Sequence, residues 1–127
     1  MSDNTQINIL ITGAAGFIGF HISRKLCELG YAVTGIDTLN DYYDVQLKLD
    51  RLGQLRTFSN FQFFTISITD KDSLDDLFEK HKFTIVINLA AQAGVRFSIE
   101  KPYKYLDANL TGFLNVLEAC RQNKVKH

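Results

Sequence analysis

The chain of 127 residues predicts an α/β fold in which helices cover both faces of a parallel sheet. Short apolar runs of strand length alternate along the chain with longer segments of helical periodicity. The first apolar run leads directly into a glycine-rich turn. Hydrophobic residues make up 46% of the chain and the formal net charge is zero, which suits one globular domain with one core.

The first half of the chain predicts two strand–helix units. Ile7–Thr12 is the first strand, Phe17–Leu29 is the helix after it, and Gly30 ends that helix. Tyr31–Ile36 is the second strand. The apolar stripe expected on the first helix consists of Ile18, Ile22, Leu26 and Leu29. The second helix is predicted from the spacing of Val45, Leu49, Leu52 and Leu55.

The second half predicts two further units. Phe61–Ile66 is the third strand, and Asp70 caps a helix whose apolar residues are Leu74, Leu77 and Phe78. Thr84–Leu89 is the fourth strand, and its nearly continuous apolar character indicates a strand covered on both faces. A loop is expected from Ala90 to Lys101. The last helix runs from Pro102 to about Asn123, with a buried side formed by Leu106, Leu110, Phe113, Leu117 and Cys120.

Four successive strand–helix units predict right-handed crossovers and the strand order 3-2-1-4. This is the first half of a Rossmann-like, doubly wound parallel sheet with flanking helices. A ligand of such a sheet lies across the carboxyl ends of the strands, at the switch between strands one and four.

The turn between the first strand and the first helix predicts a pyrophosphate site. Gly13 allows a tight exit from the strand, Gly16 lets backbone N–H groups approach a phosphate, and Gly19 lets the helix pack near the strand. The start of the helix adds free N–H donors and a positive dipole end. The spacing G-x-x-G-x-x-G is one residue longer than G-x-G-x-x-G, so an ordinary strand-to-helix turn is the alternative.

Asp37 follows the second strand, eighteen residues after Gly19. A carboxylate there can accept a hydrogen bond from the 2′-hydroxyl of an adenosine ribose and would repel a 2′-phosphate. The position therefore favours NAD over NADP as the cofactor. A loop carboxylate or helix cap is the alternative interpretation.

Composition argues against several other classes of function. The balanced charge provides no basic field for nucleic acid or anionic lipid. No apolar run approaches the roughly 18 residues of a membrane span, and the polar first residues do not form a secretory signal. Cys27 and Cys120 are expected as small, buried or half-buried thiols, which makes the cytoplasm the expected location. The three histidines show no metal-ligand spacing.

Four segments resemble the extended short-chain dehydrogenase/reductase family, and more narrowly NAD-dependent nucleotide-sugar epimerases of the UDP-glucuronate 4-epimerase type. The residues that carry the resemblance are Thr12–Gly19, Asp37–Asp44, Asn88–Ser98 and Asn109–Gly112. The resemblance implies a tightly bound NAD that takes a hydride from C4 of the sugar and returns it to the other face. The expected substrate is a nucleotide sugar.

The resemblance also implies roles for single residues. The pyrophosphate would be held by Gly13, Gly16, Phe17, Ile18 and Gly19, and the adenosine ribose by Asp37 with Asn40 nearby. Ser67 and Ile68 would line the adenine. The nicotinamide half would lie over Leu89, Ala90 and Ala91, and Asn109 would brace the site as a buried amide. Arg96 is a hypothetical contact to an anionic part of the sugar nucleotide, with a plain surface arginine as the alternative.

Two departures from the family pattern stand out. Ser67 occupies a position at which relatives usually carry an aspartate, which predicts weaker anchoring of the adenine amino group. No tyrosine of the chain is followed four residues later by lysine, so the Tyr-x-x-x-Lys motif that performs the acid–base chemistry is absent. The chain is thus expected to be the N-terminal part of a NAD-binding domain and to be inactive by itself.

Without a fifth strand, Thr84–Leu89 would be left as an apolar sheet edge, which predicts self-association or a homodimer. Leu106, Phe113 or Leu117 is expected to become partly exposed for the same reason. Two other functions stay open: a dehydratase or reductase of the same extended family, and a non-catalytic NAD-binding module.

Overall fold

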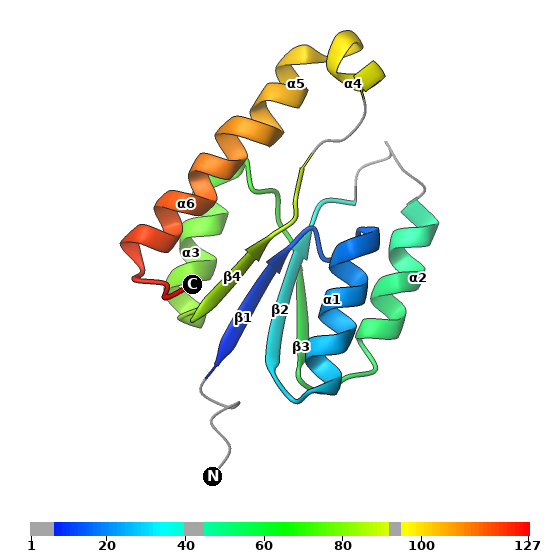
Figure 1. Cartoon of the computed structure of the whole chain (residues 1–127), viewed down its shortest axis with the longest axis vertical. Coiled ribbons are helices and arrows are strands. Elements are labelled where there is room, and N and C mark those ends of the chain that lie inside the picture. The colour runs from blue at the N-terminus through cyan, green and yellow to red at the C-terminus, as the bar shows by residue number, and fades with distance from the viewer. Residues whose placement is uncertain (1–6, 40–44, 92–94) are drawn as a thin grey trace.

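The computed structural model describes residues 7–39, 45–91 and 95–127. Within these residues, four parallel strands form one sheet in the order β3-β2-β1-β4 (Figure 1). The predicted order 3-2-1-4 is therefore confirmed. The strands are β1 (Asn8–Thr12), β2 (Ala32–Asp37), β3 (Phe61–Thr65) and β4 (Ile85–Asn88).

Helices α1 (Phe17–Glu28) and α2 (Val45–Leu55) cover one face of the sheet (Figure 1). Alternate side chains of β1 supply this layer, and its core includes Ile9, Ile11, Phe20, Leu52 and Leu55. The predicted apolar stripe of the first helix is partly wrong, because Ile18 and Leu29 are exposed while the buried residues are Gly19, Phe20, Ser23 and Cys27. The close approach of Gly19 to the preceding turn fixes which face of α1 points inward.

Helices α3 (Lys71–His81) and α6 (Gly112–Gln122) cover the opposite face. Leu10 of β1 points into this second core together with Leu74, Phe78 and Val116. The predicted cap of α3 is confirmed, because the Asp70 carboxylate accepts a hydrogen bond from the backbone N–H of Ser73. The two cores together enclose the middle of the sheet.

The segment between β4 and α6 differs from the prediction. Part of the expected loop from Ala90 to Lys101 is a helix, α4 (Val95–Glu100), which ends before Pro102. The predicted last helix is present as three consecutive parts: α5 (Pro102–Leu106), the π-helical segment η2 (Asp107–Thr111) and α6. A π-helical turn contains an extra residue, which alters the side of the helix that faces the sheet.

The buried side expected for the last helix is wrong for its large residues. Leu106, Leu110, Phe113 and Leu117 are between 46% and 60% exposed, and the residues of α6 that are buried are Gly112, Val116 and Ala119. Small residues let the helix lie close to the sheet layer, while the large side chains point away from it. The predicted partial exposure of Leu106, Phe113 and Leu117 is confirmed.

The expectation of an open β4 edge is also wrong in part. The backbone N–H of Lys126 donates to the carbonyl of Thr84 at 3.0 Å, and the N–H of Val86 donates to the carbonyl of His127 at 2.9 Å. The C-terminal residues therefore pair with the beginning of this edge, as an added strand would. Self-association of the chain stays a prediction.

Candidate functional site

The turn between β1 and α1 is tied to the end of β2. The backbone N–H groups of Gly13 and Ala14 both donate to the carbonyl of Ile36, at 2.8 and 3.1 Å. Gly13 has a φ of 71°, in the left-handed region that favours glycine. The turn is thus fixed at the carboxyl edge of the sheet, as the sequence predicts.

Two glycines of the motif have no room for a side chain. A Cβ on Gly19 would lie 2.1 Å from the carbonyl oxygen of Gly13. A Cβ on Gly13 would lie 2.9 Å from backbone atoms of Leu89 and Ala90. The turn is therefore packed between the first turn of α1 and the end of β4, which agrees with the close packing expected of these glycines.

Helix α1 begins without a side-chain cap among the described residues. Gly16 is its N-cap, and the first turn contains no acidic residue. The first N–H groups of a helix have no partner within the helix, and they carry the positive end of its dipole. Phe17 and Ile18 are 67% and 59% exposed at this end. The start of α1 can therefore accept an anion such as a pyrophosphate.

Asp37 is nearly buried beside the turn, and both of its carboxylate oxygens are engaged. Oδ2 accepts a hydrogen bond from the Ala15 N–H at 2.9 Å, and Oδ1 accepts one from the Lys48 ammonium at 3.2 Å. The Lys48 ammonium also donates to the carbonyl of Thr38 at 3.0 Å. Each carboxylate oxygen can accept a further hydrogen bond. The predicted ribose contact is therefore geometrically open, while Asp37 also orients the turn.

Sequence reasoning missed the contribution of α2 to this site. Lys48 is 8% exposed, an unusual degree of burial for lysine that its ion pair with Asp37 explains. Arg51 lies three residues later, and its guanidinium donates to the carbonyl of Ala15 at 3.0 Å. Their helical spacing places both cations on one face of α2, but the spacing gives no sign of Asp37 and Ala15, which only the tertiary fold brings near.

Thr12 joins the ends of β1 and β4, a role that sequence reasoning also missed. Its hydroxyl accepts hydrogen bonds from the N–H groups of Leu89 and Ala90, at 2.9 and 3.0 Å, and donates to the side-chain oxygen of Asn88. The Thr12 side chain is fully buried. Leu89, Ala90 and Ala91, the residues expected under the nicotinamide, therefore begin directly beside the glycine turn.

The loop after β3 is attached to the protein at Ile68. Ile68 is 5% exposed and its side chain packs into the second core, so its role at an adenine stays a prediction. The amide of Asn115 on α6 donates to the Ile68 carbonyl at 2.9 Å. The Ser67 hydroxyl is paired with the hydroxyl of Thr69 at 2.7 Å and accepts the Thr69 N–H at 3.2 Å.

The remaining predicted residues do not belong to the glycine turn or to the loop after β3. Asn109 lies in η2 and is half-buried, and its role in bracing the site stays a prediction. The Arg96 side chain on α4 is 90% exposed and forms an ion pair with Glu100 at 3.2 Å. Its role toward a substrate stays a prediction. Asn40 lies outside the described residues.

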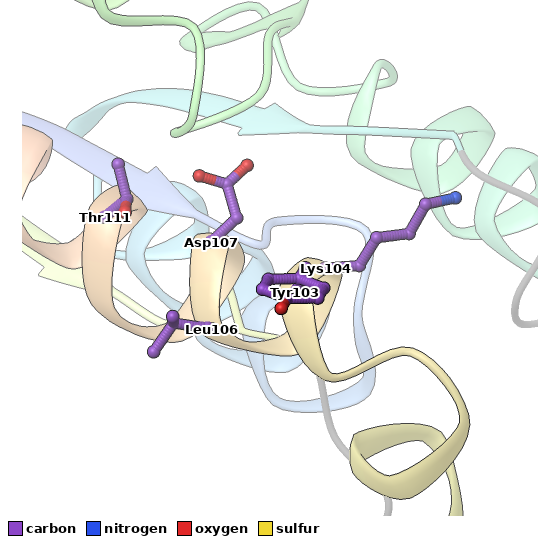
Figure 2. A pocket seen from close by; sticks show the side chains of 5 residues that line it. All are labelled: Tyr103, Lys104, Leu106, Asp107 and Thr111. Atoms are coloured by element: carbon purple, nitrogen blue, oxygen red, sulfur yellow. The ribbon is translucent and has the colours of Figure 1, made fainter.

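A shallow hollow lies on the surface of α5 and η2, apart from the glycine turn (Figure 2). Figure 2 shows that Asp107 and Leu106, two of its lining residues, point to different sides of the helix. The others are Tyr103, Lys104 and Thr111. Because one exposed helix supplies all of these side chains, the hollow lacks the opposing wall that encloses a ligand.

Neither cysteine shows the features of a catalytic nucleophile. Both are free, as expected, and burial, with a smaller contribution from the charge of Glu28, raises the pKa of the Cys27 thiol to about 11. Burial also raises the pKa of Cys120. In the described part of the chain, no group of three or more His, Cys, Asp or Glu side chains could hold a metal ion.

The described helices include none that is both long and apolar enough to cross a membrane.

Comparisons with known proteins show which sequences and folds this chain resembles. A UDP-glucuronate 4-epimerase from Thermodesulfobacterium geofontis is 49% identical over 117 residues, which are 92% of this chain and 36% of that protein. A solved UDP-glucuronic acid 4-epimerase from Bacillus cereus, in complex with UDP-glucuronic acid and NAD, superposes with a TM-score of 0.80 at 37% identity. The match covers 91% of this chain and 36% of the Bacillus chain.

A UDP-glucose 4-epimerase from Thermus thermophilus, in complex with NAD, has a TM-score of 0.77 at 34% identity, and the match covers 94% of this chain and 35% of the Thermus chain. This chain thus spans about a third of the length of these relatives. The family model described as GDP-mannose 4,6 dehydratase matches residues 10–127. The chain therefore belongs to the GDP-mannose 4,6 dehydratase family, within the extended short-chain dehydrogenases/reductases that its sequence resembles.

Proposed function

We propose that the chain is the NAD-binding portion of a nucleotide-sugar 4-epimerase that acts on UDP-glucuronate or UDP-galacturonate. The observation that carries the proposal is the turn from Thr12 to Gly19: a tightly packed glycine turn that ends at a helix start without a side-chain cap. The three relatives described above, at 34% to 49% identity, are epimerases by name, and the two solved ones are in complex with NAD.

The residues fit a dinucleotide. The pyrophosphate would lie against the backbone N–H groups at the start of α1, held by Gly16, Phe17 and Ile18. Asp37 would accept a hydrogen bond from the adenosine ribose, and its charge would exclude the 2′-phosphate of NADP. Leu89 and the two alanines after it would lie under the nicotinamide half. When bound, NAD supplies the hydride acceptor for oxidation at C4 of the sugar.

The 127-residue chain by itself would not epimerise a sugar. The proton of the 4-hydroxyl must be accepted by a base, and the Tyr-x-x-x-Lys motif that does this in the family is absent from the sequence. The epimerase activity therefore belongs to a protein in which further residues complete the site. The two free cysteines agree with a reducing compartment, and we place that protein in the cytoplasm.

A chimera tests the proposed activity. Residues 1–127 are joined to the C-terminal two thirds of the Thermodesulfobacterium geofontis enzyme, and the product formed from UDP-glucuronate is identified by chromatography and NMR. We expect inversion at C4 by the chimera and no turnover by the 127-residue chain. A folded, NAD-loaded chimera that does not invert C4 would contradict the proposal. A 4-keto product that has lost water would instead indicate the dehydratase that the family description names.

A further inference from the structure

The loop that follows β3 lies next to the expected adenosine position. Thr65, the last residue of β3, pairs in register with Asp37, the last residue of β2. Because both strands end at the same edge of a parallel sheet, the loop that begins at Ile66 flanks the residue proposed to hold the ribose. The position of this loop therefore affects the adenine end of the proposed cofactor site.

The loop is a closed turn with its own hydrogen bonds. The N–H of Asp70 donates to the carbonyl of Ser67 at 3.0 Å, and the N–H of Thr69 donates to the Ser67 hydroxyl at 3.2 Å. These bonds fix the shape of the turn but not its place relative to the sheet. Ile68, in the middle of the turn, is buried in the second core and attaches the turn to the body of the protein.

Two residues on one face of α6 hold Ile68. A Cβ on Gly112 would lie 2.6 Å from both Cγ1 and Cδ1 of Ile68, so a side chain at position 112 would force Ile68 or α6 to shift. Asn115, three residues later, donates its side-chain amide to the Ile68 carbonyl at 2.9 Å. Gly112 thus contacts the side chain of Ile68, and Asn115 contacts its backbone.

The π-helical segment η2 ends directly before Gly112. One added residue turns the following part of a helix by about 100° relative to a continuous α-helix. A different register would direct a bulkier neighbour such as Phe113 toward Ile68. The π-helical turn therefore contributes to this contact, since it brings Gly112 to the place where α6 meets the loop after β3.

We propose that Gly112 and Asn115 are positioning residues for the adenine end of the cofactor site, because together they hold Ile68 and with it the turn from Ser67 to Asp70. This inference rests on the proposed function. It adds two residues of α6 that do not contact the dinucleotide and act through the loop after β3.

Binding of NAD⁺ and of AMP, measured by calorimetry well below the melting temperature, tests the inference. We expect Gly112→Ala and Asn115→Asp each to weaken both ligands about tenfold, because AMP carries only the adenine end. Asn115→Asp is nearly isosteric and cannot donate to the Ile68 carbonyl. Leu114→Ala, at a 57% exposed position of the same helix, is the matched control and should change neither affinity.

A double-mutant cycle decides whether Gly112 acts through Ile68. In an Ile68→Ala background, Gly112→Ala should change NAD⁺ affinity less than twofold, because the atoms that the new Cβ would meet have been removed. An equal effect in both backgrounds would overturn the inference. A lowered melting temperature with unchanged affinities would also overturn it, since it would leave the two residues a purely structural role.

Hydrogen exchange supplies a readout that needs no ligand. The amides of Thr69 and Asp70 should exchange faster in Gly112→Ala and Asn115→Asp, while those of β1 should keep their wild-type protection. Unchanged exchange in the loop would contradict the inference. A wild-type chain that fails to bind NAD⁺ would instead overturn the proposed function, so the two failures can be distinguished.

Discussion

Two strand-to-helix turns lie at the carboxyl edge of the same sheet, and their helices begin in opposite ways. Helix α3 starts at Asp70, whose side chain accepts the Ser73 N–H, and Asp72 adds a negative charge to its first turn. Helix α1 starts at Gly16, with neither a side-chain cap nor an acidic residue in its first turn. An anion is thus disfavoured at α3 and favoured at α1. Of these two helix starts, the start of α1 is therefore the one that can bind a phosphate.

The largest expected effect comes from filling the packed turn before α1. Gly19→Ala places a Cβ 2.1 Å from the Gly13 carbonyl oxygen, and backbone must move to accept it. We expect destabilisation by about 3 kcal/mol or more, at the upper end for overpacking. Urea unfolding measures it. Gly53→Ala on α2, where a Cβ would meet no atom within 4 Å, is the control and should stabilise by about 0.5–1 kcal/mol. Equal behaviour of the two variants would contradict the packing argument.

The next largest effect concerns the ion pair between Asp37 and Lys48, beside the glycine turn before α1. Asp37→Asn leaves Lys48, whose side chain is 11% exposed, without a counter-charge, and removing one partner of a buried pair costs about 3 kcal/mol. The same variant removes the charge that would repel a 2′-phosphate, so the ratio of NADP⁺ to NAD⁺ affinity should rise. The double variant with Lys48→Met should regain part of the lost stability. An unchanged cofactor ratio would show that Asp37 only supports the turn.

A side-chain cap on α1, like the one on α3, should weaken the binding of a pyrophosphate at the start of α1. Gly16 has φ −73° and ψ 174°, an extended conformation open to any residue. Gly16→Asp and Gly16→Ala add the same Cβ, but only the aspartate can cap the helix and repel a pyrophosphate. We expect at least tenfold weaker NAD⁺ binding for the aspartate variant than for the alanine variant, with equal or higher stability. Equal binding by the two would contradict the proposed phosphate position.

The smallest effect is expected at the closed turn. Hydrogen bonds from Ser73 lower the pKa of Asp70 below its usual value of 3.8. The ionised cap therefore stabilises the folded chain above pH 3.8, and this contribution is lost as the pH falls through the lowered pKa. Asp70→Ala should lower the melting temperature slightly at neutral pH and not in strong acid. Thermal melts of the variant and the wild-type chain at both pH values check this, and an equal difference at the two pH values would contradict it.

The sequence was sufficient for what depends on local patterns. The four strands, the cap at Asp70 and the glycine turn follow from periodicity and from the physical needs of single residues. The strand order follows from the doubly wound topology that four successive strand–helix units favour. The buried face of the last helix could not be read in this way, since a π-helical turn before Gly112 moves the large residues away from the sheet. Lys48 and Arg51 were missed because their partners, Asp37 and Ala15, are brought near only by the tertiary fold.

The central claim is that the turn from Thr12 to Gly19, together with Asp37, forms a NAD⁺ site within these 127 residues. A thermal melt of the chain, titrated separately with NAD⁺ and NADP⁺, tests it most directly. A ligand at a hundred times its Kd stabilises the folded state by about 2.7 kcal/mol, which shifts the melting temperature of a domain of this size by several degrees. We expect that shift with NAD⁺ and a much smaller one with NADP⁺. No shift with NAD⁺, or equal shifts with both, would contradict the claim.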